Sequence, residues 1–349
     1  MKKHSIIPIF IPHNGCKNDC VFCNQKSITA RSESPSESQV ISIVERNLST
    51  INRANVQTTE IAFFGGSFTG LNMNQQNKYL DIAKRYKDDL KVDYIRISTR
   101  PDYIDKEILN NLKEHRVDII ELGAQSFDDQ VLKLSGRGHD ASCICNAASL
   151  IKSHGFKLGI QLMVGLPGDA KEKALYSTEQ TISLKPDMAR IYPTIVLNDT
   201  KLKEMFNNGE YKPFGEDEMI EIVSLMYSKL KENNITVLRV GLKSTDLISR
   251  ESDLVFNDYH PAFRQLVEGK LALAQMENAL KDEMNKNPSI EDHEAEILFY
   301  AQERSISSLS GHKKANRIFL KNKYPRFTFR FIGDNSLNDD EIKLKVLIS

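Results

Sequence analysis

Residues 5–24 read SIIPIFIPHNGCKNDCVFCN, a short apolar run followed at once by three closely spaced cysteines. The run over 5–11 is rich in isoleucine and is typical of a buried β-strand. Cys16, Cys20 and Cys23 follow it in a Cys-x3-Cys-x2-Cys arrangement. The chain has an odd number of cysteines, five, and clusters three of them, which favours a metal site over a disulfide framework.

The same alternation of a β-rich run with a longer amphipathic stretch continues along the chain as far as Val240. It predicts strands at 5–11, 60–64, 94–98, 119–122, 157–164, 188–192 and 237–240. Helices are predicted between them at 39–50, 74–86, 106–114, 129–134, 141–154, 171–183 and 216–232. Successive βα units of this length predict an α/β fold, a complete or partial parallel barrel. In such barrels the chemistry collects at the carboxyl ends of the strands.

The alternation breaks around residues 242–253, which places a domain boundary near residue 245. We expect a barrel over 1–245 and a smaller α+β extension over 246–349, an accessory domain that could dock substrate. The chain has 47 Lys and Arg against 47 Asp and Glu, which excludes a diffusely basic nucleic-acid binder. Residues 304–330, however, hold eight Lys or Arg and no Asp or Glu. The rings interleaved with these cations are Phe319, Tyr324, Phe327 and Phe329, a pattern that indicates a surface for RNA phosphates and stacked bases, or a solvated face.

The N-terminus carries no convincing export signal. Its apolar stretch is short and interrupted by Pro8, and no apolar run in the chain approaches the roughly 18 residues that a membrane helix needs. We therefore expect a cytoplasmic protein with no membrane partner.

Three thiolates on one loop can hold three irons of a 4Fe–4S cluster and leave the fourth iron open to another ligand. The alternative is a zinc site with His13 as the fourth ligand, in a non-catalytic RNA-binding module. The residues of the loop alone leave both readings open.

With Phe22 directly before the last cysteine, the loop resembles the signature of the radical S-adenosylmethionine (radical SAM) enzymes. Later segments agree with this resemblance, each at the end of a predicted strand: GGSFTG at 65–70, YIRISTRPD at 94–102, ELGAQS at 121–126, GRGH at 136–139, GIQLMVGLPG at 159–168 and RIYPT at 190–194. As a set, over about residues 5–245, they resemble the radical SAM half of the Elongator catalytic subunit and its bacterial stand-alone relatives. They are more distantly similar to the oxygen-independent coproporphyrinogen oxidases.

The resemblance implies a partial barrel with a 4Fe–4S cluster on Cys16, Cys20 and Cys23. It implies that S-adenosylmethionine (SAM) is bound by Phe22, Gly65, Gly66, Ser67, Ser98, Gln125, Arg137, Gln161 and Gly165. Within this set, Gly66 and Ser67 would meet the methionine amino group, Ser98 the ribose, and Arg137 a carboxylate. Tyr192 and His139 are the candidates for catalytic contact with substrate.

The resemblance further implies reductive cleavage of SAM to a 5′-deoxyadenosyl radical, with an electron from a donor such as flavodoxin or ferredoxin. The implied substrate is an RNA, a tRNA by the resemblance to Elongator, docked through 304–330. The alternative is a small-molecule or porphyrin-like substrate. Two departures limit the resemblance. The cysteine spacing is shorter than in Elongator subunits, with no recognisable acetyl-coenzyme A loop, so acetyl chemistry is not transferred. Gln161 also stands where the coproporphyrinogen relatives place an acid.

Overall fold

The computed structural model describes residues 2–11, 16, 19–24, 34–52, 56–242, 260–338 and 341–348. They fall into two compact units, Met1–Gly215 with Lys229–Pro261, and Glu216–Ser228 with Ala262–Ser349. The boundary predicted near residue 245 lies outside the described residues and stays a prediction. Within the described ranges, no helix is long and apolar enough to cross a membrane.

The first unit is built on a seven-stranded sheet whose order follows the sequence, with every pair parallel. Its strands are β1 (Lys2–Ile11), β2 (Val56–Gly65), β3 (Tyr94–Thr99), β4 (Ile119–Gln125), β5 (Lys157–Val164), β6 (Met188–Pro193) and β7 (Thr236–Val240). The predicted α/β class and parallel partial barrel are confirmed.

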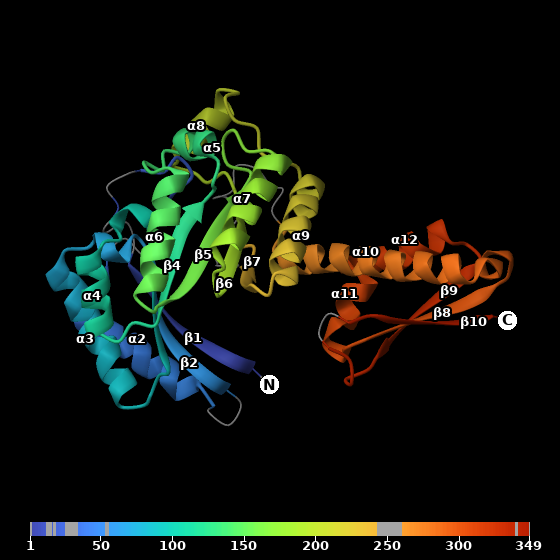
Figure 1. The fold of residues 1–349 in the computed structure, drawn as a ribbon, viewed down its shortest axis with the longest axis horizontal. Helices are drawn as coiled ribbons and strands as arrows, with labels where there is room; N and C mark the ends of the chain where they lie inside the picture. The colour runs from blue at the N-terminus through green and yellow to red at the C-terminus, as the bar shows by residue number, and fades with distance from the viewer. Residues whose placement is uncertain are drawn as a thin grey trace. The chain divides into compact units, whose positions relative to one another are not determined.

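Helices lie between successive strands along the chain, and α2, α3, α6 and α7 pack on the sheet (Figure 1). The helices between the strands are α2 (Glu37–Thr50), α3 (Met73–Asp88), α4 (Lys106–Glu114), α5 (Asp129–Leu134), α6 (Ala141–Ser153), α7 (Lys171–Leu184), α8 (Lys201–Asn207) and α9 (Glu216–Glu232). Residues Glu216–Ser228 of α9 belong to the second compact unit. Polar side chains cap most of the amino ends of these helices; Asp105, for example, accepts a hydrogen bond from Ile108 N at 2.8 Å. The helix α8 was not among the predicted helices.

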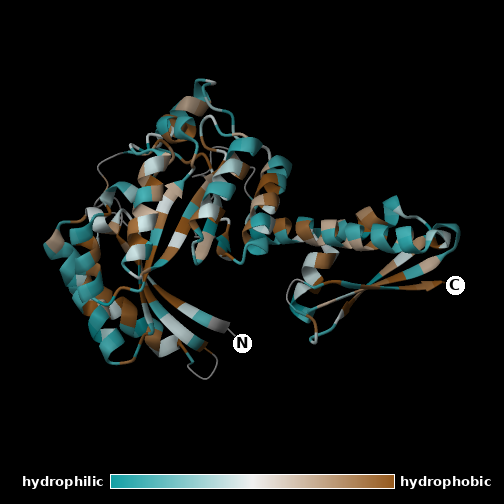
Figure 2. Cartoon of the chain, viewed as in Figure 1, coloured by the Kyte–Doolittle hydropathy of each residue, from teal (hydrophilic) through white to brown (hydrophobic). Residues whose placement is uncertain are grey.

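The strands alternate between an apolar outer face and a polar inner face. Ile7, Ile61, Ile95, Ile120 and Leu158 are fully buried, and the register pairs their strands so that these side chains point toward the helices. Figure 2 shows hydrophobic residues in brown alternating with hydrophilic ones in teal along the helices and strands. Burying such a side chain stabilises the fold by about 1.5–3 kcal/mol. Successive side chains of a strand face opposite sides, so the positions between these apolar residues face inward. Glu60, Arg96 and Glu121 occupy such inner positions.

The second unit is an α+β structure. Its sheet has the order β10-β8-β9, with β8 (Ala295–Ala301) parallel to β9 (Phe327–Gly333) and antiparallel to β10 (Lys343–Ile348). α10 (Phe263–Lys286), α11 (Ile306–Ser310) and α12 (Ala315–Lys323) accompany it. Met276, Leu280, Ile297, Phe299 and Phe329 belong to the shared core of this unit.

Candidate active site at the carboxyl edge of the sheet

Backbone hydrogen bonds hold the cysteine loop against two later segments of the chain. The loop turns between Cys20 and Cys23, whose peptide N–H donates to Cys20 O at 3.0 Å. Val21 N donates to Ser135 O at 3.1 Å, and Val21 O accepts from Leu202 N at 2.8 Å. The loop is therefore fixed between the end of α5 and the start of α8.

Phe22 packs with Val21 against a small cluster made of Val196, Leu202 and Tyr211. The ring thus anchors the loop to the segment that follows β6. Its predicted contact with the cofactor is not part of this packing and stays a prediction.

The glycine pair after β2 is required by close packing against β1. Gly65 has φ +111°, and a Cβ there would lie 2.7 Å from Ile11 O, while Gly66 N donates to the same oxygen at 2.7 Å. Ser67 follows with 3% exposure, and its Oγ lies 3.5 Å from Cys16 Sγ. The end of β2 and the cysteine loop therefore meet, as the sequence predicted from two separate motifs.

The end of β4 is irregular and supports two polar side chains. The register shifts between Gly123 and Gln125, and Gln125 adopts φ +69° while 5% exposed. Such strain in a buried non-glycine residue is found mostly at functional sites. A Cβ on Gly123 would lie 3.0 Å from Gln125 Nε2 and 3.6 Å from Arg137 Nη2, so the glycine leaves room for both side chains.

Arg137 reaches from the segment after α5 to the cysteine loop. Its Nη1 donates to Cys20 Sγ at 3.1 Å, and its Nη2 donates to Gly123 O. It is 5% exposed, so its charge acts on Cys20 with little screening by water.

Arg100 is a site residue that the sequence reasoning did not single out. It forms a bidentate pair with Asp102, both contacts at 2.9 Å, and donates to Arg137 O. Its Nη1 lies 4.0 Å from Cys20 Sγ. Burial lowers the pKa of Arg100, but its hydrogen bond and charge interaction with Asp102 outweigh this effect and raise it. Its position directly before Pro101, after the strand predicted at 94–98, was the sequence feature that could have identified it.

Ser98, Gln161 and Gly165 lie at the ends of β3 and β5. Ser98 Oγ donates to Glu121 Oε1 at 3.4 Å, and Gln161 Nε2 donates to Gln125 Oε1 at 3.2 Å. Gly165 O accepts from Tyr211 Oη at 2.6 Å. Hydrogen bonds thus connect Gln161 with Gln125, two residues that the sequence assigned to one cofactor.

The two predicted catalytic residues differ in their surroundings. His139 Nε2 is buried without a hydrogen-bond partner among the described residues, and burial and the Arg137 charge lower the pKa of His139 to about 4. The imidazole is therefore neutral at pH 7. Tyr192 is partly exposed, and its Oη accepts from Arg190 Nη1 at 3.1 Å.

Within the described residues, no three Cys, His, Asp or Glu side chains are grouped as metal ligands. Residues 12–15 and 17–18 of the cysteine loop, including His13, lie outside the described ranges. The donor set nevertheless fits an iron–sulfur cluster in its chemistry. It consists of three thiols that form no disulfide among the described residues, and Cys20 lies next to two buried guanidinium groups.

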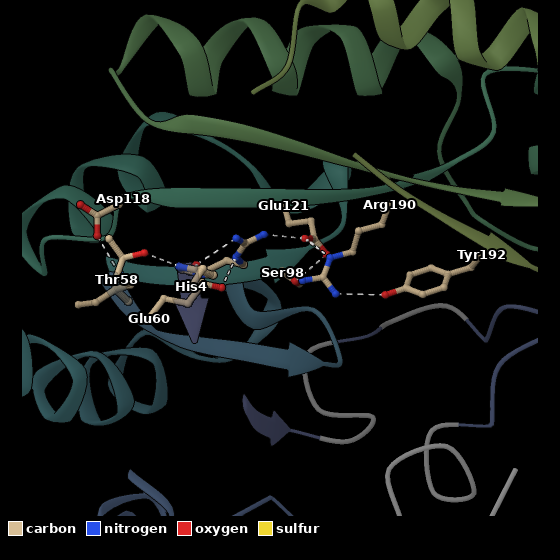
Figure 3. A network of polar contacts seen from close by, with 10 residues as sticks. His4, Thr58, Glu60, Ser98, Asp118, Glu121, Arg190 and Tyr192 are labelled. Carbon is tan, nitrogen blue, oxygen red and sulfur yellow. Dashed lines mark hydrogen bonds and ion pairs between the residues drawn. The ribbon is translucent and has the colours of Figure 1, made fainter. Parts of the chain in front are cut away.

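The sequence reasoning also missed a row of buried charges inside the sheet: Glu60, Arg96, Glu121 and Arg190. Figure 3 shows the network that contains them, running from His4 and Thr58 to Arg190 and Tyr192. Charged residues at alternate positions of otherwise apolar strands were the signal that could have identified them.

The basic segment 304–330 lies in the second unit, and the structure corrects part of its interpretation. Phe327 and Phe329 are 4% and 8% exposed in the core, so they are not available to stack on bases. Phe319 is 42% exposed on α12. Arg317 and Lys321 are exposed and four residues apart, so they share one side of α12, and the exposed Lys314 directly precedes this helix.

Comparisons with known proteins agree with this arrangement. Residues 10–180 match the family model of the radical SAM superfamily, and residues 186–272 match that of the radical SAM C-terminal domain. The tRNA uridine(34) acetyltransferase of Methanocaldococcus infernus is 35% identical over 158 residues, which are 44% of this chain and 30% of that protein. Elongator complex protein 3 of Bos taurus is 33% identical over 133 residues, which are 37% of this chain and 24% of that protein.

Among solved structures, the archaeal Methanocaldococcus infernus Elp3 with an N-terminal deletion is similar in fold. The TM-score is 0.55 at 23% identity, covering 71% of this chain and 61% of the other. The chain thus spans a quarter to a third of the length of the two sequence relatives above. The predicted resemblance to the radical SAM half of Elongator subunits is confirmed.

Proposed function

The chain belongs to the radical SAM superfamily of enzymes, and we propose that it binds a 4Fe–4S cluster and SAM at the carboxyl edge of its sheet and cleaves SAM reductively. The convergence of Cys16 with Ser67 and of Cys20 with Arg137, at 3.5 and 3.1 Å, carries this proposal. Three segments that are distant in the sequence meet there, as a cofactor held by several strand ends requires.

Cys16, Cys20 and Cys23 would hold three irons and leave the fourth for the methionine amino and carboxylate groups of SAM. When bound, the cluster would supply one-electron reducing chemistry for the cleavage of SAM, and SAM would supply the radical chemistry on the substrate. A donor such as flavodoxin or ferredoxin would reduce the cluster.

The chain's own residues bind and orient the cofactor. The Ser67 hydroxyl can accept a hydrogen bond from the methionine ammonium, and the Arg137 fork can pair with the carboxylate. Ser98 and Gln125 are suited to the polar ribose groups, and Gln161 and the backbone at Gly165 to the adenine. The neutral imidazole of His139 can accept a hydrogen bond or a proton at Nε2, and Tyr192 can contact substrate.

Anaerobic reconstitution tests the first part of the proposal. Replacing Cys16, Cys20 and Cys23 with alanine should abolish iron binding and 5′-deoxyadenosine formation with dithionite and SAM. The matched control replaces Cys143 and Cys145, whose thiol pKa values are raised by burial, and should retain both. A colourless protein with stoichiometric zinc, or SAM cleavage that survives loss of the three loop cysteines, would contradict the assignment.

We further propose that the substrate is a tRNA and that the protein acts in the cytoplasm. Two relatives carry tRNA uridine(34) acetyltransferase and Elongator names, although the acetyl chemistry in those names is not extended to this chain. The cations of α12 and its amino end support RNA docking, because exposed Arg317 and Lys321 lie on one side of the helix with Ile318, itself 55% exposed, and the exposed Lys314 directly precedes it.

Filter binding of tRNA across a salt series tests this substrate. Replacing Lys314, Arg317 and Lys321 with serine should lower the slope of log affinity against log salt by about 2 to 3, since each lost phosphate contact contributes about 0.7–0.9. The matched control, which replaces the exposed α10 residues Lys270, Lys281 and Lys286, removes the same charge from the same unit. Equal slopes for both triple variants would contradict docking at α12, and salt-insensitive binding would favour a small-molecule or porphyrin-like substrate.

A further inference from the structure

Four charges of alternating sign cross the inside of the sheet from β2 to β6. Glu60, Arg96, Glu121 and Arg190 are 0%, 2%, 2% and 7% exposed. Arg96 pairs with Glu60 at 2.9 Å and with Glu121 at 3.1 Å, and Arg190 Nε lies 2.8 Å from Glu121 Oε2. Each charge has an oppositely charged neighbour, which is the condition under which buried ions are tolerated.

A missing side chain on β5 lets Arg190 reach Glu121. The register places Gly159 between Glu121 on β4 and Met188 on β6. A Cβ on Gly159 would lie 3.2 Å from Glu121 Cγ and 3.3 Å from Met188 Cγ. The glycine therefore opens the space in which side chains of β4 and β6 meet over β5.

Glu121 connects the two halves of the proposed site. Its Oε2 faces Arg96 and Arg190, and its Oε1 accepts the hydroxyl of Ser98 at 3.4 Å. Ser98 is the proposed ribose contact, and Arg190 holds the proposed substrate contact Tyr192. One carboxylate thus positions a cofactor-facing group and a substrate-facing group together (Figure 3).

The contact between Arg190 and Tyr192 determines the direction of the phenol. A guanidinium has donors and no acceptor, so at 3.1 Å the Tyr192 oxygen must accept from Arg190 Nη1. The hydroxyl hydrogen of Tyr192 then points away from Arg190. The Arg190 guanidinium also lies 4.9 Å from the centre of the Phe64 ring, which restricts it from a second side.

We propose that Glu121 and Arg190 are positioning residues that fix Tyr192 as a hydrogen-bond donor to an acceptor on the substrate. For an RNA substrate that acceptor would be an exocyclic carbonyl oxygen of a nucleobase. The identity of the acceptor, and of the ribose contact at Ser98, rests on the proposed function; the direction of the phenol does not.

Fluorine NMR of the metal-free protein tests the Arg190 contact without any activity. The protein is labelled with 3-fluorotyrosine, and Tyr192→Phe identifies the Tyr192 resonance. In Arg190→Met this resonance should move clearly from its wild-type position, because the guanidinium that donates to the phenol oxygen at 3.1 Å is gone. Glu121 keeps Arg96 as a partner in this variant, so the carboxylate is not left unpaired.

Lys87→Met is the matched control. It removes another partly buried pair of the same unit, with Asp118 at 2.6 Å, and should leave the Tyr192 resonance in place. An unmoved Tyr192 resonance in Arg190→Met would overturn the proposal, as would an equal displacement in Lys87→Met.

Steady-state kinetics test the role of Glu121 once an RNA substrate is in hand. Arg190→Met should raise the KM for the RNA several-fold more than the KM for SAM, whereas Glu121→Gln should raise both, because Glu121 holds Ser98 as well. If Glu121→Gln changes the KM for the RNA and the KM for SAM by the same factors as Arg190→Met does, then Glu121 does not connect the two groups. If no RNA is a substrate while the fluorine shift is observed, the proposed substrate fails and the positioning of Tyr192 stands.

Discussion

Arg96 neutralises two carboxylates inside the sheet, so Arg96→Met is the most informative single change to the fold. Its Nε and Nη2 donate to the two oxygens of Glu60 at 2.9 and 3.0 Å, and its Nη1 donates to Glu121 at 3.1 Å. After the substitution Glu121 keeps Arg190. Glu60, which is fully buried, keeps only His4, whose side chain is 33% exposed, at 3.2 Å.

The expected cost follows from this asymmetry. Burial raises the pKa of Glu60, but the His4 hydrogen bond and the Arg96 guanidinium together lower it below 4.5. Glu60 is therefore ionised at pH 7, and Arg96→Met leaves a buried charge largely unpaired. Removing one partner of such a pair costs about 3–5 kcal/mol, a large part of the 5–15 kcal/mol that holds a typical domain.

The assay must report on the first unit alone, because the chain has two compact units and a global melt would combine their transitions. Urea-dependent hydrogen exchange of peptides from β2 and β3, read by mass spectrometry, gives the local free energy of unfolding. The control Lys87→Met, whose side chain and that of Asp118 are 12% and 25% exposed, should cost clearly less.

The double variant Glu60→Gln/Arg96→Met separates charge from packing. Removing the carboxylate together with the guanidinium should recover about half of the loss, because no ion is then left without its partner. A loss below about 1 kcal/mol in Arg96→Met, or a double variant no more stable than the single one, would refute the reasoning.

Three further outcomes are expected. Gly65→Ala should destabilise β1 and β2 by about 2 kcal/mol or more in the same exchange assay. The new Cβ would lie 2.7 Å from Ile11 O, on a backbone with φ +111°. Unchanged protection of these strands from hydrogen exchange would contradict the close packing. Phe327→Ala should cost about 3–5 kcal/mol in the second unit, whereas Phe319→Ala, at an exposed ring, should change little; the same exchange assay on peptides from β8 and β9 measures both. His139 has a folded pKa of about 4, below the ordinary 6.5, so the unfolded state binds its proton first and the stability of the first unit should fall as the pH falls from 6.5 to 4. His139→Gln should remove this part of the pH dependence when the local free energy of unfolding of the first unit is measured at several pH values.

The fold of the first unit was predictable from local patterns. The predicted strand at 157–164 agrees with β5 at both ends, and the predicted helix at 106–114 agrees with α4. Periodicity is strong in these segments because each strand buries one face and each helix one stripe. The second unit is not built from a repeated βα unit. Its strand β8 pairs parallel with β9 and antiparallel with β10, so its sequence shows no regular alternation.

Part of the candidate site was predictable as well. Ser67 and Arg137 were assigned from motifs, and the fold brings both to the cysteine loop. Arg100 was not identified, because its contacts with Asp102 and Arg137 depend on the turn after β3. Phe327 and Phe329 were assigned to a surface, although strand alternation in β9 places them in the core.

The sequence by itself determined the order of the elements, the parallel sheet and the set of residues at its carboxyl edge, because spacing and periodicity act locally along the chain. Only the tertiary structure decided the charge pairing inside the sheet. Glu121 meets Arg96, Arg190 and Ser98 because the register of three strand pairs and the space over Gly159 bring them together. Register is a property of paired strands, and no single stretch of sequence contains it.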